Sequence, residues 1–150
     1  MSELRNQLLE FHTAFSQGIA DTPAVPEDDV VKLRARLVVE EAFELLEAMF
    51  SDGYFTSVKN EVKEKICSAT VSVDMVELAD ALADIDYVVE GTRVTFGIDG
   101  KPIAAEVHRS NMSKLGAKKD SNGKILKPEG WAPPNIEQEL IRQGWVNDSR

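Results

Sequence analysis

Cysteine and histidine are scarce in the sequence, and no long hydrophobic run is present. Cys67 is the only cysteine among 150 residues, so no internal disulfide can form. No histidine or second cysteine stands near it, which favours a half-buried thiol in a reducing compartment over a catalytic thiol. The apolar runs are too short for a membrane span, and residues 1–7 lack the basic stretch and apolar core of a signal peptide. We therefore expect a cytoplasmic protein that does not cross a membrane.

Positive charge is also scarce, which argues against binding to duplex nucleic acid. Lys and Arg number 17 against 26 Asp and Glu, and the net charge is −9. Nonspecific binding to a duplex needs a basic surface that displaces the counterions of the phosphates. Residues 1–100 contain 8 basic and 20 acidic residues, whereas residues 101–150 contain 9 and 6. Folding can therefore bring an acidic, metal-binding surface next to a basic, anion-binding one.

Proline, glycine and strand-like alternation are limited, so we expect one helical domain over residues 1–150. The chain has 6 Pro, 9 Gly and 43% hydrophobic residues, as a globular protein with one core does. Apolar residues recur every three or four positions, which predicts an all-α helical bundle. A small hairpin is expected at Asn122-Gly123. The caps and stop signals predict helices at residues 2–18, 28–51, 57–67, 72–96 and 102–112, and a short one after residue 135.

Four glutamates form an acidic stripe on the second expected helix. On a helical wheel, Glu40, Glu41, Glu44 and Glu47 share an arc of about 120°. Most other positions around this part of the helix are apolar, so we expect the helix to be covered on most sides. No Lys or Arg stands three or four residues after the first three glutamates. The stripe therefore lacks partners on its own helix.

The fourth expected helix repeats this acidic pattern. Glu77, Asp80 and Asp84 share one side, away from the apolar side of the helix. Like charges on facing helices repel one another, so a compensating cation is expected. Mg²⁺ takes oxygen ligands and is often paired with substrate phosphates, and it suits such a cluster. The alternative is that both acidic stripes are only solvated faces.

A basic segment follows in the last third of the chain. Residues 106–114 (EVHRSNMSK) contain imidazole, guanidinium, hydroxyl, amide and ammonium groups, and further lysines follow at 118, 119, 124 and 127. These residue types commonly contact phosphate. Together with the acidic stripes, they indicate a polyphosphate ligand that meets metal on one side and cations on the other. The alternative is an ordinary basic helix end followed by a solvated turn.

In combination, these motifs resemble a known superfamily. Glu40-Glu41-x-x-Glu44, followed by acids about one long helix later, resembles the EExxE and ExxD signature of the all-α nucleoside triphosphate pyrophosphohydrolases. That superfamily includes MazG-like proteins, dimeric dUTPases and phosphoribosyl-ATP pyrophosphohydrolase. Residues 108–114 (HRSNMSK) and 127–131 (KPEGW) resemble the small bacterial and phage house-cleaning enzymes of the MazG-like group. The resemblance covers most of the chain from Phe11-His12 onward.

The resemblance implies a hydrolytic activity that depends on Mg²⁺ or Mn²⁺. The expected reaction is cleavage of a nucleoside triphosphate between its α- and β-phosphates, which yields a nucleoside monophosphate and pyrophosphate. The substrate would be dUTP, another (d)NTP or a nonstandard nucleotide. Metal-activated water needs no covalent nucleophile. The resemblance also implies a homodimer, and Val39, Phe43, Leu46 and Phe50 make the second helix apolar enough to contact a partner.

The first acidic motif supplies the expected catalytic and metal-binding carboxylates. By the resemblance, Glu41 and Glu44 match metal ligands. Glu40 is either a further ligand or the group that orients the attacking water. One carboxylate of the Glu40-Glu41 pair is expected to accept the proton of that water.

The second acidic motif departs from the family pattern. Asp84 matches its aspartate, but Ala81 stands three residues earlier, where the family has a glutamate. Asp80, or the pair Glu77-x-x-Asp80, would then have to supply the missing ligand. The number of metal ions is therefore open.

The resemblance assigns the other side of the substrate to the basic segment and the N-terminus. The expected phosphate contacts are Arg109, Asn111, Lys114 and Lys127, and the expected nucleobase-side residues are His12 and Phe15. His108 is expected to be structural or a phosphate donor. The identity of the base and the choice of ribose or deoxyribose are open.

Two other functional classes deserve comparison with this hypothesis. A di-iron carboxylate protein needs Glu-x-x-His pairs, and neither His12 nor His108 stands in that spacing. A catalytically impaired nucleotide-binding sensor or interaction protein of the same fold is the stronger alternative, because the second motif is altered.

Overall fold

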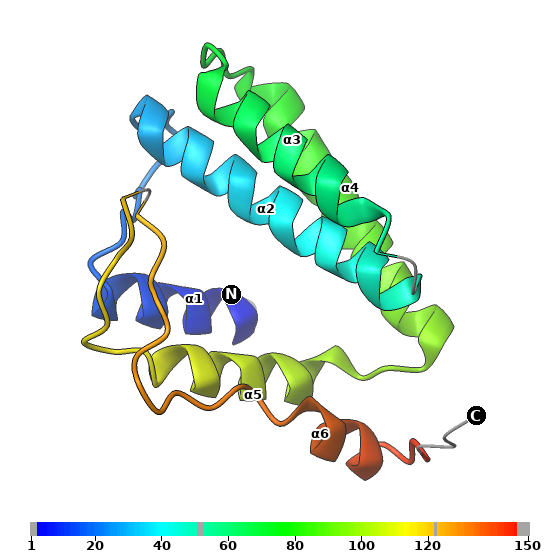
Figure 1. Cartoon of the computed structure of the whole chain (residues 1–150). Coiled ribbons are helices and arrows are strands. Elements are labelled where there is room, and N and C mark those ends of the chain that lie inside the picture. Colours follow the sequence, from blue (N-terminus) through cyan, green and yellow to red (C-terminus); the bar gives the residue numbers. More distant parts are fainter. Residues whose placement is uncertain (1–2, 51–52, 122, 147–150) are drawn as a thin grey trace. The chain divides into compact units, whose positions relative to one another are not determined.

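The computed structural model describes residues 3–50, 53–121 and 123–146, and these residues form an all-α structure. The expectation of a helical fold is therefore confirmed. Between Lys119 and Ile125 the described part of the chain forms one isolated antiparallel bridge. The helices in Figure 1 are α1 (Glu3–Ala14), α2 (Asp28–Met49), α3 (Phe55–Ser68), α4 (Met75–Phe96), α5 (Gly100–Met112) and α6 (Ile136–Arg142).

Local sequence signals account for most helix ends. Gly97 follows α4 with a φ of +70°, a conformation that glycine adopts readily, and it ends the helix where expected. Asp99 caps α5 by accepting a hydrogen bond from the backbone N–H of Lys101, and Asn135 caps α6 in the same way. The bridge beside Gly123 agrees with the expected small hairpin. The predicted helix ends at Ser2 and Ser51 and the predicted hairpin residue Asn122 lie outside the described residues.

Contacts divide the chain into two compact units. The first comprises residues 1–22, 76–119 and 125–150, and the second comprises residues 23–75 and 120–124. The expectation of a single domain over residues 1–150 stays a prediction. None of the described helices combines the length and apolar composition that crossing a membrane would require.

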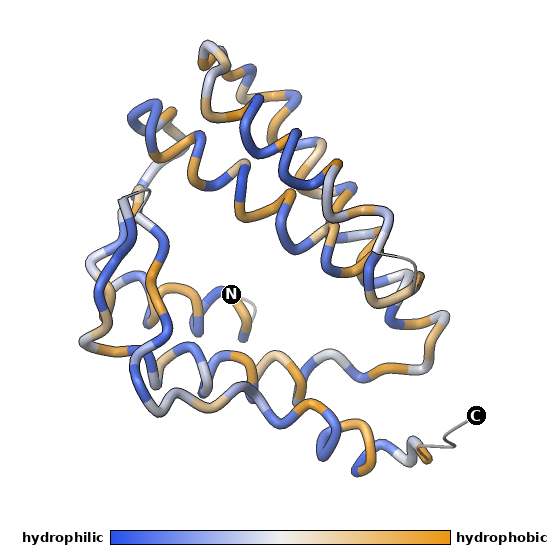
Figure 2. The backbone as a smooth tube through the Cα atoms, viewed as in Figure 1, coloured by the Kyte–Doolittle hydropathy of each residue, from blue (hydrophilic) through white to orange (hydrophobic). Residues whose placement is uncertain are grey.

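The second unit is a pair of helices with a short turn packed against them. Helices α2 and α3 lie side by side (Figure 1), and Figure 2 shows hydrophobic and hydrophilic positions alternating along both. Phe43 of α2 and Phe50, which directly follows this helix, both contact the ring of Phe55, at centroid distances of 6.4 and 5.8 Å. Part of the apolar surface that we expected at a dimer interface is therefore used against α3. Val38, Leu45 and Met49 are exposed instead.

The first unit packs α1 and α6 against α5. Phe15 is its most deeply buried hydrophobic residue, with 7% of its surface exposed, and its ring packs on Phe11 at 4.3 Å. Helix α4 also belongs to this unit, yet its large apolar side chains are exposed. They include Val76, Tyr87, Val88, Val94 and Phe96.

Candidate active site

Glu40 of the acidic stripe forms ion pairs with two lysines from other parts of the chain. Lys63 of α3 lies 3.2 Å from its Oε2, and Lys124 of the 120–124 turn lies 2.6 Å from its Oε1. The Glu40 side chain is 17% exposed. The hydrogen bond from Lys124 lowers the pKa of the Glu40 carboxyl, and Lys63 adds to this effect, while partial burial opposes it. Glu40 is therefore ionised at neutral pH and bound to two ammonium groups.

Glu47, one end of the stripe, is also paired. Lys59 donates to its Oε2 at 3.1 Å, and Thr56 donates to its Oε1 at 2.9 Å. Lys59 and Lys63 are one turn apart on α3, so both reach the same side of α2. The expectation that a metal ion must compensate the whole stripe is therefore wrong for Glu40 and Glu47. Their partners come from a neighbouring helix and a distant turn, which positions along α2 alone cannot reveal.

The remaining acids are the better candidates for metal ligands. Glu44 is exposed and has no hydrogen bond or ion pair with any residue in the described ranges. On α4, Asp80 and Asp84 are one turn apart and likewise exposed and unpaired in the described part of the chain. Glu77 lies one turn before Asp80 on the same side of α4, and Glu41 is exposed on α2.

The acidic residues of α2 and α4 belong to different units. Among the described residues, no three Asp, Glu, His or Cys side chains form a group that could hold a metal ion. Each unit supplies unpaired oxygen ligands, and their meeting around one metal ion stays a prediction.

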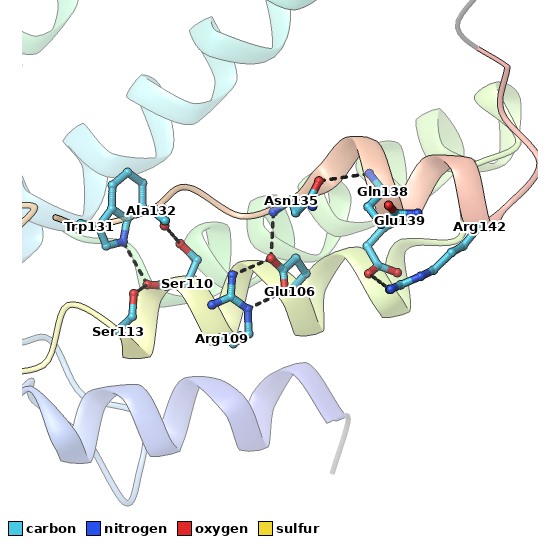
Figure 3. A network of polar contacts seen from close by, with 10 residues as sticks. All are labelled: Glu106, Arg109, Ser110, Ser113, Trp131, Ala132, Asn135, Gln138, Glu139 and Arg142. Atoms are coloured by element: carbon cyan, nitrogen blue, oxygen red, sulfur yellow. Dashed lines mark hydrogen bonds and ion pairs between the residues drawn. The ribbon is translucent and has the colours of Figure 1, made fainter.

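The basic segment begins with an ion pair within α5. Arg109 donates from Nε to Glu106 Oε2 at 2.7 Å and from Nη2 to Oε1 at 2.6 Å. The backbone N–H of Asn135 also donates to Glu106, at 2.8 Å (Figure 3). Arg109, followed by the Asn135 N–H, lowers the pKa of Glu106 to about 2. The guanidinium that we expected to contact phosphate is thus already bound to a carboxylate.

Replacing Glu106 by Gln should lower Tm at pH 7 and have little effect on Tm near pH 2. The folded-state pKa is depressed, so the carboxylate stabilises the fold above its ordinary pKa of 4.5, and this contribution is lost as the pH falls toward about 2. Thermal melts from pH 7 to pH 2 should show the gap between wild type and Glu106→Gln closing. A control, Glu137→Gln on α6, should follow the wild type. A gap that does not change with pH would contradict the assignment.

Two further predicted phosphate contacts lie beside one tryptophan. Lys114 donates to Asn111 Oδ1 at 2.8 Å, and its Nζ lies 5.2 Å from the centre of the Trp131 ring. Lys127 Nζ lies 4.5 Å from the same ring. The structure thus brings together Asn111, Lys114 and Lys127. Arg109 pairs with Glu106 instead.

Ser110 and Trp131 support this cluster, and neither was expected as a site residue. Ser110 is 1% exposed, and its Oγ donates to the carbonyl of Ala132 at 3.2 Å. Trp131 Nε1 and Ser113 Oγ both donate to the carbonyl of Ser110 (Figure 3). The KPEGW motif was the available sequence signal, because a tryptophan between lysine and prolines suggests a defined contact.

The N-terminal residues assigned to the nucleobase have different surroundings. His12 Nδ1 lies 3.0 Å from the carbonyl of Gly18, so this nitrogen carries the proton and donates it. Phe15 packs inside the first unit, and its carbonyl accepts a hydrogen bond from Lys119 at 3.0 Å. His108 contacts Glu10 at 3.1 Å and so links α5 to α1, which is a structural contact.

Sequence comparison identifies the family. Residues 8–111 match the phosphoribosyl-ATP pyrophosphohydrolase family. The chain belongs to this family. The matched region begins in α1 and ends at Asn111, and it includes the acidic residues of α2 and α4. The protein is therefore an enzyme of the pyrophosphohydrolase type. Lys114, Lys127 and Trp131 lie beyond the matched region.

A solved structure extends the similarity over nearly the whole chain. A candidate NTP pyrophosphohydrolase from Exiguobacterium sp. 255-15, whose crystal structure was determined at 1.78 Å resolution, is 29% identical. The match covers 95% of this chain and 96% of that chain, with a TM-score of 0.69. No curated protein sequence matches the chain.

Proposed function

We propose that this pyrophosphohydrolase-family enzyme is a Mg²⁺-dependent nucleoside triphosphate pyrophosphohydrolase. It cleaves the α–β phosphoanhydride of a (d)NTP, such as dUTP or a nonstandard nucleotide, to a nucleoside monophosphate and pyrophosphate. The observation that carries this proposal is the contact between Lys124 and Glu40. It places one lysine of the 120–124 turn against the acidic stripe within one unit, and a site for a metal-bound polyphosphate needs both carboxylates and cations.

The chemistry of the unpaired carboxylates fits Mg²⁺. Glu44, Asp80 and Asp84 offer hard oxygen ligands and break no described ion pair when they bind a cation. Glu41 and Glu77 are the further candidates. Bound Mg²⁺ would polarise phosphoryl oxygens and lower the pKa of water, and Mn²⁺ would supply the same chemistry.

Glu40 is poorly suited to be the proton acceptor of the Glu40-Glu41 pair. Lys124 and Lys63 lower the pKa of Glu40 and therefore weaken it as a base. The ion pairs instead suit Glu40 to hold Lys124 beside the substrate phosphates. Glu41, the next residue, is the one we assign to accept the proton of the attacking water.

The basic segment binds the phosphates and stabilises the charge of the leaving pyrophosphate. Lys114→Ala is expected to raise KM at least about tenfold, because a hydrogen bond to a charged group contributes about 1.5–3 kcal/mol. Arg109→Ala should raise KM less, since Glu106 already occupies the guanidinium. Steady-state kinetics and Tm of both variants test this order. Unchanged kinetic constants for Lys114→Ala would show that the basic segment is only a solvated face.

We further propose that the enzyme is a homodimer through its long helices. Exposed apolar side chains support this, because α4 carries Val76, Tyr87, Val88, Val94 and Phe96, and α2 carries Val38, Leu45 and Met49. Sedimentation at micromolar concentration should give a dimer, and Val88→Lys should shift it toward monomer. A wild-type monomer under these conditions would contradict the proposal.

A panel of nucleoside triphosphates tests the reaction class. The wild-type enzyme should release pyrophosphate from at least one of them in the presence of Mg²⁺. Binding without turnover across the panel would instead favour the impaired nucleotide sensor, which the alanine at position 81 already suggests. Release of orthophosphate would contradict cleavage at the α–β bond.

A further inference from the structure

Two lysine side chains share the ring of Trp131. Lys114 follows α5, whereas Lys127 and Trp131 lie in the segment that leads to α6. Their Nζ atoms lie 5.2 and 4.5 Å from the centre of the indole ring. Both distances are in the range of cation–π contacts. The ring of Trp131 is therefore a common neighbour of two ammonium groups from different parts of the sequence.

The position of the indole is defined by hydrogen bonds to α5. Trp131 Nε1 donates to the carbonyl of Ser110 at 3.2 Å, and the buried Ser110 Oγ donates to Ala132 at 3.2 Å. These two bonds run in opposite directions between α5 and residues 131–132, as Figure 3 shows. Lys114 is oriented separately by Asn111, at 2.8 Å. The ring therefore has a fixed place beside the end of α5.

The aromatic ring attracts the ammonium group of Lys127 without neutralising its charge. Lys127 forms no ion pair with a carboxylate in the part of the chain that the structure describes. An anion that contacts Lys127 would compensate its charge, and Lys114 beside the same ring offers a second donor to a larger anion. A ligand with several negative oxygens close together, such as a diphosphate group, fits this arrangement best.

We propose that Trp131 is a positioning residue that assembles Lys114 and Lys127 into a binding site for a diphosphate group. Trp131 acts through the two lysines and makes no contact with the reacting atoms. The inference rests on the proposed function for the source of the diphosphate, which would be the pyrophosphate product or the same group within the substrate. The new element is Trp131, whose ring explains why Lys114 and Lys127 lie beside each other's contact partner.

Titration calorimetry measures the affinity of the site for inorganic pyrophosphate in the absence of turnover. The variants are Lys127→Gln, Trp131→Leu and Trp131→Phe, and orthophosphate is the comparison ligand. Trp145→Leu is the matched control, because it removes the other tryptophan of the chain, which takes no part in the cluster. Tm of each variant reports on folding. Should Trp131→Leu not fold, Trp131→Phe and Lys127→Gln carry the test.

Trp131→Leu and Lys127→Gln are expected to weaken pyrophosphate binding about tenfold, the loss typical of one charged contact. Trp131→Phe keeps an aromatic face and should stay within about threefold of the wild type. In turnover assays, Trp131→Leu should raise KM more than it lowers kcat. Orthophosphate, which offers fewer oxygens, should bind more weakly and respond less to these changes.

Two results would overturn the inference. One is wild-type affinity for pyrophosphate in both Lys127→Gln and Trp131→Leu. The other is an equal loss in Trp131→Phe and Trp131→Leu, which would assign the effect to the indole hydrogen bond and not to the ring face. Failure of the proposed function looks different: pyrophosphate binding would still depend on Trp131, but no nucleoside triphosphate would be hydrolysed.

Discussion

Replacing Glu41 by Gln, or Asp84 by Asn, is expected to lower turnover at least about 100-fold. Loss of a group that merely supports a metal ligand commonly costs 10–100-fold in metal affinity or activity, and a direct ligand should cost at least as much. A neutral amide is also a poorer ligand for a hard cation than a carboxylate. In the absence of metal, Asp84→Asn should raise Tm, because it removes the repulsion between Asp84 and Asp80, which lie one turn apart on α4.

Asp86→Asn is the matched control for this prediction. Asp86 lies on α4 with Asp84 and is also exposed, but it points to the opposite side of the helix from Glu77. The substitution should leave kcat, and the response of Tm to Mg²⁺, close to the wild type. If Glu41→Gln and Asp84→Asn also retained full turnover, the acidic stripes would be solvated faces and the proposed metal site would be wrong.

Removing divalent metal is expected to abolish turnover and to lower the stability of the wild-type enzyme. A ligand present at 100 times its Kd stabilises the folded state by about 2.7 kcal/mol, and binding of Mg²⁺ should be visible on this scale. Activity in excess EDTA should fall to background and return with Mg²⁺ or Mn²⁺. Thermal melts with and without Mg²⁺ measure the stabilisation directly.

Asp84→Asn serves as the internal control for the metal effect on stability. Its melting temperature should respond less to Mg²⁺ than that of the wild type, because one ligand has been neutralised. Equal stabilisation of both proteins would place the metal elsewhere. Full activity of the wild type in excess EDTA would exclude a metal-dependent mechanism.

The helices could be predicted closely because their boundary signals are local. Gly97 ends α4 and Asn135 caps α6, and both effects depend on a few adjacent residues. Helix α3 begins at Phe55, two residues before the expected start at residue 57. The rings of Phe43 and Phe50 contact Phe55, and this tertiary contact extends the helix beyond what the local pattern indicates.

The acidic stripe was visible in the sequence, but its partners were not. Lys63 and Lys124 bind Glu40 from positions 23 and 84 residues away in the chain. A helical wheel compares residues only within one helix, so it cannot distinguish the paired Glu40 from the unpaired Glu44. The fold therefore pairs Glu40 and Glu47 of the stripe with lysines, and we propose the other two glutamates as metal ligands.

The contacts of the basic segment could likewise not be predicted from the sequence pattern. Arg109, Asn111 and Lys114 were all expected to contact phosphate, yet Arg109 is bound to Glu106 through an ion pair that spans one helical turn. The burial of Ser110 depends on the return of the chain at residues 131–132. No periodic pattern around Ser110 predicts that return, so the contact between Trp131 and Ser110 was not predicted.

The most direct test of the central claim is ³¹P NMR of a nucleoside triphosphate hydrolysed by the enzyme with Mg²⁺ in ¹⁸O-labelled water. Attack by water at the α–β phosphoanhydride predicts two products, a nucleoside monophosphate and pyrophosphate, with one ¹⁸O atom in one of them. A nucleoside diphosphate and orthophosphate would instead show cleavage at the β–γ bond. That result would contradict the account.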